Sequence, residues 1–497
     1  MTHPHNDPKP SVSDPVALRS RLAGTNGPRY WRGLEELAES EEFFEFLSQE
    51  FPRQSANQWH DGPSRRRFLQ LMSASLALAG VGGCAVKQAE RIVPYVKAPE
   101  ELVLGKPLFF ATAMTLGGFA TGLLIESHEG RPTKAEGNPL HPASLGTTDP
   151  FAQAEPLSLY DAERSQAITR NNRPSSWNDF QLAAVNLFNQ QRASGGAGLR
   201  ILTGTITSPT LAHEIRLLLE DLPEARWHQY EPVHRDHARL GALMAFGEDV
   251  QPRYDVEKAD VILTLDADFL GSGPSHLPAT QGFANRRDPD HEAGLNRLYV
   301  VECMLTTAGA KADHRLPMAA GRIADFALAL AREVGVEGTP ALSAELPETA
   351  RRWIGPLSQD LQQHEGRSLI LAGDGQPPIV HALAHALNDR LGNVGQTVTY
   401  SEPVLAGPVE GETVDQTESL RELVRDMDAG QVETLVILGV NPVYDSPADI
   451  PFRQALLKRD EQNRFVVPMR IHNGLYEDET AVLCQWHVPQ AHFLEAW

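Results

Sequence analysis

Cysteine is scarce in this sequence. Among 497 residues there are three, Cys84, Cys303 and Cys484, and no CxxC pair. An iron–sulfur cluster is normally held by four cysteine thiolates, so this chain cannot supply a complete set. A disulfide between Cys303 and Cys484 is allowed in an oxidising compartment, but sequence alone does not establish that the two residues meet.

Several signatures of catalysis are also missing. The sequence contains no GxGxxG, GxxxxGK[ST], HExxH or GxSxG pattern, which leaves nucleotide, zinc-protease and serine-hydrolase chemistry without local support. Two histidine pairs, His234 with His237 and His487 with His492, lack a third ligand at a standard spacing. Surface or satisfied core positions are therefore favoured over a metal site for all four.

Positive charge is in deficit as well. The 44 Lys and Arg residues face 65 Asp and Glu residues, giving a formal net charge of -21. Nucleic acid binding requires a face rich in Lys and Arg, so nucleic acid is excluded as a partner. Electrostatic adhesion to anionic lipid is disfavoured for the same reason, and any membrane contact has to come from a lipid anchor or a partner.

Only one long apolar run occurs, over residues 68–83, and it is short for a membrane span. As a helix it would measure roughly 24 Å against the ~30 Å of a bilayer core. The segment before it reads SRRRFL, the twin-arginine export pattern, in which Arg65, Arg66, Phe68 and Leu69 are the signal residues. The run ends in VGGC, a lipobox that predicts lipidation of Cys84. A buried core helix is the alternative, although three glycines weaken it.

The signal begins unusually deep in the chain, after an extension over residues 1–63. The start of this extension is rich in His, Pro, Asp and Ser and predicts disorder. Residues 31–51 place large apolar side chains at helical spacing before Pro52 and predict a short acidic amphipathic helix. That helix is either a solvated element with one apolar face or a docking element.

Alternating strand and helix patterns fill the chain after residue 175. Continuous apolar strands end in Gly, Asp or Asn at residues 199–204, 261–268, 297–303, 368–375, 434–442 and 464–471, with helical patterns between several of them. Such strands are typical of parallel sheets covered on both faces. The predicted class is α/β, with doubly wound, mostly parallel sheets. We expect a small β-rich domain over residues 85–175, a first α/β domain over 176–340 and a second over 341–497.

Ligands of open parallel sheets bind beyond the carboxyl ends of the strands. That rule selects a set of candidate cleft residues, Gly204, Asp266, Asp268, Gly373, Asp374 and Asn441. Glycine lets a backbone approach a phosphate or pterin, and Asp or Asn can bond a ribose or guanine edge. Ordinary tight turns between strands and helices explain the same pattern and are favoured, because no nucleotide motif accompanies it.

Three stretches resemble the molybdopterin oxidoreductase superfamily, at residues 122–165, 435–449 and 477–497. The resemblance is closest to the ActB branch of alternative complex III, also described as Tat-variant-translocated molybdopterin oxidoreductases. Its features are YWRGLEELA before a delayed twin-arginine signal, CAVKQAERIVPYVKAPE, GTITSPTL, EPVHRD and ADHRLP. The resemblance covers nearly the whole chain, implies the superfamily fold, and adds Glu479 and Thr480 to the candidate cleft residues.

The departures from that superfamily point away from catalysis. Catalytic members carry a cluster-binding cysteine motif, a Cys, selenocysteine or Ser ligand to the metal, and a PGTD cofactor contact. This chain has FFATAMTLGGFATG, YEPVHRDHARLGALMAFG and AAGRIAD in the corresponding stretches, with no Cys at all and no Ser in the ligand segment. We therefore expect no catalytic residue, metal ligand or cofactor in this chain, so the named cleft residues would be vestigial.

The resemblance also implies a setting. A non-catalytic structural subunit would serve the electron-transfer module of a quinol-oxidising complex, at the periplasmic face of the cytoplasmic membrane. Its implied partners are an iron–sulfur ferredoxin-like domain or subunit expected beyond this sequence, c-type cytochrome subunits and integral membrane quinol-binding subunits. Two alternatives stay open, namely a molybdopterin enzyme with a non-standard ligand such as Glu231 or His234, and an exported lipoprotein that binds a small ligand.

Overall fold

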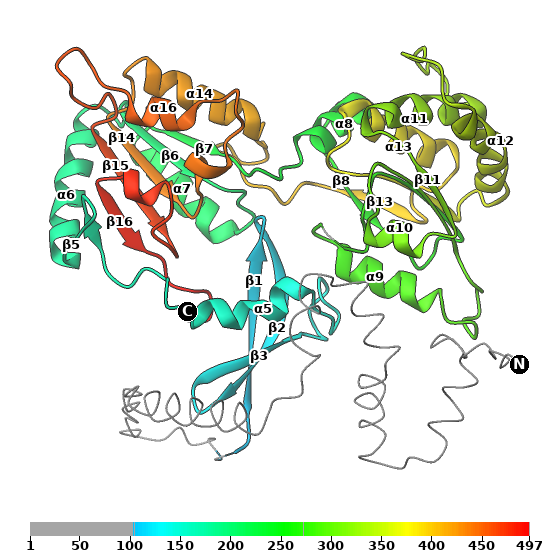
Figure 1. Cartoon of the computed structure of the whole chain (residues 1–497), viewed down its shortest axis with the longest axis horizontal. Coiled ribbons are helices and arrows are strands. Elements are labelled where there is room, and N and C mark those ends of the chain that lie inside the picture. The colour runs from blue at the N-terminus through cyan, green and yellow to red at the C-terminus, as the bar shows by residue number, and fades with distance from the viewer. Residues whose placement is uncertain (1–102, 104, 272, 497) are drawn as a thin grey trace, which may run out of the picture. The chain divides into compact units, whose positions relative to one another are not determined.

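The computed structural model describes residue 103, residues 105–271 and residues 273–496 (Figure 1). The predicted amphipathic helix, the twin-arginine signal with Arg65, Arg66, Phe68 and Leu69, and the lipobox with Cys84 lie outside the described residues. Within the described part of the chain, no helix is both long and apolar enough to cross a membrane.

A three-stranded antiparallel sheet opens the described part. Its strands β1 (Leu108–Leu116), β2 (Phe119–His128) and β3 (Arg131–Gly137) pair in sequence order. The β2–β3 hairpin turns at Glu129 and Gly130, which have φ of 54° and 84°, as a tight hairpin turn requires. Helix α5 (Pro150–Leu159) follows, with Asp149 accepting a hydrogen bond from the Ala152 amide at 2.7 Å.

A seven-stranded sheet forms the first α/β layer, in the order β5-β4-β16-β15-β14-β6-β7. The strands from β16 to β7 are parallel, and Figure 1 shows the late strands β14 to β16 beside the much earlier β6 and β7. The strands are β4 (Thr169–Arg170), β5 (Arg173–Pro174), β6 (Leu199–Thr203), β7 (Arg226–Gln229), β14 (Thr434–Leu438), β15 (Met469–Gly474) and β16 (Trp486–Pro489). Its helical elements are α6 (Trp177–Ala193), α7 (Pro209–Asp221), α14 (Gln416–Asp428), α15 (Pro442–Asp445), α16 (Phe452–Leu457) and the 3-10 turn η1 (Ala481–Leu483).

A four-stranded parallel sheet forms the second α/β layer, in the order β11-β10-β9-β12. Its strands are β9 (Val261–Leu265), β10 (Arg297–Glu302), β11 (His314–Pro317) and β12 (Ser368–Ala372). The helices around it are α8 (Asp236–Phe246), α9 (His276–Asn285), α10 (Thr307–Lys311), α11 (Ala320–Val334), α12 (Glu348–Gln363) and α13 (Pro378–Arg390). A separate antiparallel pair joins β8 (Gln251–Tyr254) to β13 (Val398–Ser401).

Each sheet packs apolar side chains on both of its faces. In the second sheet, Leu263 faces a cluster with α11 and α13, whereas Ile262 faces a cluster with α9. In the first sheet, Leu435 and Ile437 face α14 and α16. Burial on both faces explains the continuous apolar strands in the sequence. The expected α/β class with mostly parallel sheets is confirmed.

The expected division between residues 340 and 341 does not separate the two sheets. Strand β12 lies after that boundary but pairs with β9, and β14 pairs with β6 from before it. The small β-rich segment likewise ends before residue 169, because β4 and β5 extend the first sheet through β16. The two α/β layers are thus interleaved along the chain.

One strand also begins later than expected. The pattern over residues 464–471 predicts a strand from its first residue, yet β15 starts at Met469. Pro468 comes immediately before it and has no amide hydrogen to donate to a sheet. Residues 460–464 instead form a turn in which Asp460 accepts the Arg464 amide hydrogen at 2.8 Å, and Phe465 after it forms only an isolated bridge with Arg459.

Candidate functional site

The switch point of the first sheet lies between β6 and β14. The chain proceeds from β6 to β7 on one side and from β14 to β15 on the other, the arrangement that opens a crevice in doubly wound sheets. Gly204 directly follows β6. A Cβ atom added there would lie 2.4 Å from Oε1 of Glu231, so the close approach requires glycine.

Three of the predicted residues meet at this edge. The Asn441 side chain donates from Nδ2 to Oε2 of Glu479 at 2.7 Å and accepts at Oδ1 from the Thr480 hydroxyl at 2.7 Å. The hydrogen bond from Asn441 lowers the pKa of Glu479. Thr480 Oγ1 also accepts the Val443 amide hydrogen at 3.1 Å, at the start of α15. The structure places these three residues together, and their polar groups are largely engaged with one another.

Two carboxyl groups at the same edge, Glu231 and Asp445, have raised pKa values. Burial raises the pKa of Glu231, and burial together with the charges of Glu231 and Asp478 raises the pKa of Asp445 to about 6. Oδ1 of Asp445 is buried and has no hydrogen-bond partner among the described residues. With a pKa of about 6, Asp445 can hold a proton in mildly acidic solution. Asp445 was missed from sequence, where it is one of many scattered acidic residues.

At the second sheet, Asp266 and Gly373 lie close together, directly after the neighbouring strands β9 and β12. Asp266 has a φ of 58° and accepts from the Cys303 amide at 3.0 Å and from Nε2 of Gln376 at 2.9 Å. A Cβ atom added at Gly373 would lie 1.9 Å from the Asp266 carbonyl oxygen. Asp268 accepts the Ala308 amide hydrogen at 2.8 Å, near the start of α10. Both aspartates therefore stabilise backbone, as the tight-turn alternative expects.

Residues 230–236 connect the edges of the two sheets. Arg235 donates from Nε to Oδ1 of Asp374 at 3.0 Å, beyond β12 of the second sheet. Asp236 accepts the amide hydrogens of Gln416 and Thr417 at 3.1 Å, at the start of α14 on the first sheet. His234 contacts the Thr417 hydroxyl at 2.9 Å through Nε2. The proposed alternative ligand His234 is thus occupied by structural contacts.

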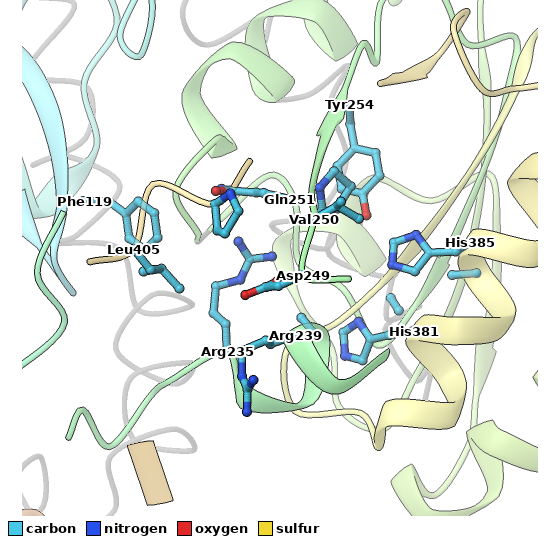
Figure 2. Close-up of a pocket in the computed structure, with 15 residues that line it drawn as sticks. Phe119, Arg235, Arg239, Asp249, Val250, Gln251, Tyr254, His381, His385 and Leu405 are labelled. Atoms are coloured by element: carbon cyan, nitrogen blue, oxygen red, sulfur yellow. The ribbon is translucent and has the colours of Figure 1, made fainter. Parts of the chain in front are cut away.

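A cavity of about 60 Å³ lies beside this connection (Figure 2). Figure 2 shows the rings of His381 and His385 projecting from α13 into the space that Asp249 and Tyr254 also line. Burial lowers the pKa of both histidines to about 4. Nε2 of His381 and Nε of Arg239 have no hydrogen-bond partner among the described residues. The cavity has room for a few water molecules, whereas ligand pockets usually enclose ~300–1,000 Å³.

The histidine pairs that the sequence offered as metal sites do not converge. His487 contacts His472 through Nδ1 atoms 3.0 Å apart and Ser165 through Nε2 at 2.6 Å, whereas His492 contacts Ser158 at 2.8 Å. Burial lowers the pKa of His487 to about 4. Among the residues that the structure describes, no group of three His, Cys, Asp or Glu side chains could hold a metal ion.

The two described thiols lie in different environments, one buried and one exposed. Cys484 is buried in the apolar cluster beneath α14 and α16, and burial raises its pKa to about 12. Cys303 is exposed beyond β10, where its pKa is raised by desolvation and by Asp266. Both are free, so the disulfide that the sequence allowed is absent from the structure.

Comparison with known proteins gives two informative matches, although no family model matches the sequence. The molybdopterin-binding-like subunit of menaquinone reductase from Nitratidesulfovibrio vulgaris (strain Hildenborough) is 23% identical over 428 residues, which cover 79% of this chain and 60% of that protein. The chain thus spans less than two thirds of this relative's length. Acetylene hydratase from Pelobacter acetylenicus matches in structure with a TM-score of 0.53 and 12% identity, over 76% of this chain and 62% of that one.

A pterin-bound metal, the group of the catalytic members that this chain resembles, would need a protein ligand from the segment that begins at Tyr230. Within residues 230–236 the side chain left for a metal is the Glu231 carboxylate, since His234 is paired with Thr417 and the two described thiols lie elsewhere. These residues do not fit the cofactor.

Proposed function

We propose that this molybdopterin-oxidoreductase-like chain is a non-catalytic subunit, without a cofactor of its own, in a quinone-linked electron-transfer complex. The relative from Nitratidesulfovibrio vulgaris supports the assignment, because its name places a molybdopterin-binding-like subunit in a menaquinone reductase. The fold supports it as well, since acetylene hydratase shares it across most of this chain. The complex, its quinone and its other subunits are part of the proposal.

The observation that carries the non-catalytic role is the use of residues 230–236. In an enzyme this segment would present a ligand to the metal, so its side chains would have to face an open crevice. Here Arg235 and Asp236 reach to opposite sheets, and His234 supports the start of α14. A segment engaged in this way holds the two α/β layers together, which is a structural task.

We further propose the ActB role in alternative complex III. Export by the twin-arginine signal at Arg65 and Arg66 would place the chain on the periplasmic face, and lipidation of Cys84 would hold it at the membrane. Its partners there would be an iron–sulfur ferredoxin-like domain or subunit, c-type cytochromes and integral membrane quinol-binding subunits. Iron–sulfur clusters would belong to those partners, because this chain has too few cysteines to hold one.

A catalytic molybdopterin enzyme is the second candidate, and one observation favours it. Glu231 and Asp445 both have raised pKa values at the carboxyl edge of the first sheet, and perturbed carboxyls gather at functional sites. In that case Glu231 would be the ligand to the metal.

Metal analysis of the complex decides between the two candidates. The complex would be purified from host membranes through a tag on this chain, and molybdenum, tungsten and iron would be counted by mass spectrometry against the amount of the chain. We expect iron from partner subunits and no stoichiometric molybdenum or tungsten. One molybdenum or tungsten atom per chain, lost in Glu231→Gln and retained in the exposed control Glu224→Gln, would establish the enzyme.

The same purification tests the third candidate, an exported lipoprotein that binds a small ligand. The electron-transfer subunit should migrate on size exclusion with haem-containing and iron–sulfur subunits. Migration as a monomer free of haem would instead favour the lipoprotein.

A further inference from the structure

Helix α6 exposes several large apolar side chains to solvent. Of its 17 residues only Gln191 is buried, although the helix carries Trp177, Leu182 and Val185, which are 53%, 66% and 58% exposed. A surface helix normally turns its apolar stripe to the core and its polar residues to water. Phe180 provides the contact with the sheet, edge-on to Trp486 with ring centroids 5.4 Å apart. Phe188 packs against Leu199 and Leu222, whereas Trp177, Leu182 and Val185 lack a cover.

Apolar side chains of α6 form one wall of an apolar groove of about 860 Å³, whose other wall is α7. Leu182, Val185 and Phe188 come from α6, and Leu218 and Leu222 come from α7. Near the groove an adjoining apolar space of about 350 Å³ reaches the sheet itself, at Ile201, Val436 and Leu438. The sheet is therefore incompletely covered between its two helices on this face.

The groove has the dimensions of a single helix. Helix α6 extends about 25 Å at 1.5 Å per residue, which is close to five turns. Arg192 of α6 pairs with Asp221 of α7 at 2.9 Å and ties the two helices together at their C-terminal ends. An uncovered apolar surface of this kind marks an interaction site, and a helix laid into a groove is a common way to fill it.

The rim of the groove identifies the charge of the occupant. On the α7 side the exposed side chains are Glu214, Glu220 and Asp221, which line an adjoining hollow. On the α6 side they are the neutral Asn178, Gln181 and Asn189. Arg192 and Asp221 offset each other in their ion pair, so Glu214 and Glu220 give the α7 side its net negative charge. We propose that the groove between α6 and α7 binds an amphipathic helix of a partner subunit, with its apolar face on α6 and Lys or Arg toward α7.

Charge argues against two occupants from this chain, residues 31–51 and a second copy. The apolar segment over residues 31–51 contains seven glutamates and one arginine, so it would bring like charge to the acidic rim. A second copy would bring the same acidic rim of α7 against itself. The proposal rests on the proposed function only in that the partner is a subunit of the complex.

Photocrosslinking in the native complex tests this proposal. The photoreactive residue benzoylphenylalanine would replace Val185 in the full chain, expressed in host cells, and crosslinked peptides would be sequenced by mass spectrometry. We expect a peptide of another polypeptide, with apolar residues at helical spacing and an excess of Lys and Arg. The same photoreactive residue at Leu140, which is 92% exposed in the small sheet domain, should not capture that peptide.

A crosslink to residues 31–51, to α6 or α7 of a second copy, or to no peptide at all would overturn the proposal. Charge is tested by Glu220→Lys in the crosslinking chain, which should lower the yield of the Val185 product about two- to fivefold. An unchanged yield would refute the charge assignment. If the purified complex lacks every partner subunit, the proposed function fails, whereas a complete complex without the Val185 crosslink refutes only the groove.

Discussion

Replacing Asp445 by asparagine should stabilise the protein at neutral pH. The carboxyl of Asp445 is half-buried beside Glu231 and Asp478, and its pKa rises from 3.8 to about 6 in the folded chain. Between about pH 4 and pH 6, the folded chain therefore keeps a proton on Asp445 that the unfolded chain has largely lost. The free energy of unfolding falls as the pH rises from about 4 to about 6, and it stays lower above that range.

The size of the effect follows from the distance between the two pKa values. They lie about 2 apart, and each whole step is worth ~1.4 kcal/mol, which sets an upper limit of about 3 kcal/mol at pH 7.5. Partial solvent exposure reduces the gain to about 1 to 2 kcal/mol. At pH 4.0 the Asp445 carboxyl is protonated in the folded chain and still about 40% protonated in the unfolded chain, so the advantage of Asp445→Asn shrinks to about 0.5 kcal/mol or less.

Urea unfolding of both proteins at pH 4.0 and pH 7.5, followed by tryptophan fluorescence, measures the difference. Glu461→Gln is the matched control, because Glu461 is exposed and its neutralisation should change neither value. An equal gain at both pH values would mean that packing rather than ionisation separates the variants. A loss of stability at pH 7.5 would refute the buried-carboxyl reasoning altogether.

Two further predictions use the same unfolding assay. Gly373→Ala should lower the free energy of unfolding by about 2 kcal/mol or more, because its Cβ would meet the Asp266 carbonyl oxygen, whereas Gly375→Ala, with no atom within 4 Å, should change it by less than about 0.5 kcal/mol. Arg200→Met should cost about 3 kcal/mol, since the 3% exposed guanidinium is paired with Asp426 at 2.7 Å. Arg226→Met removes a 56% exposed partner of the same carboxylate and should cost below about 1 kcal/mol, so equal losses would contradict the burial argument.

Local signals in the sequence were sufficient for individual elements of the fold. Ser208 and Pro209 predict the start of a helix, and the Ser208 hydroxyl does accept the Leu211 amide hydrogen at 3.3 Å in α7. The apolar runs that became β6 and β14 likewise predict that Gly204 and Asn441 lie at the carboxyl edge of a sheet. These features depend on neighbouring residues, which the sequence displays directly.

Pairings between distant segments were not predictable in this way. The apolar run of β6 fits equally well beside β14 or beside any other buried strand, so its sequence does not reveal that the two sheets interleave. The raised pKa of Asp445 depends on Glu231, which comes from the loop after β7 and has no sequence relation to it. The weak burial of α6 was also invisible, because its apolar residues predict a covered helix.

Glu231 is the side chain that separates the enzyme hypothesis from the structural-subunit hypothesis in residues 230–236. Within residues 230–236, the Tyr230 hydroxyl donates to the Asp445 carbonyl at 3.0 Å, and His234 contacts Thr417. Arg235 and Asp236 are held by opposite sheets. Only the Glu231 carboxylate remains against backbone, near Thr205 and Gly204. A metal bound by this segment would have to use Glu231, so a complex that keeps its metal content in Glu231→Gln holds that metal in another subunit.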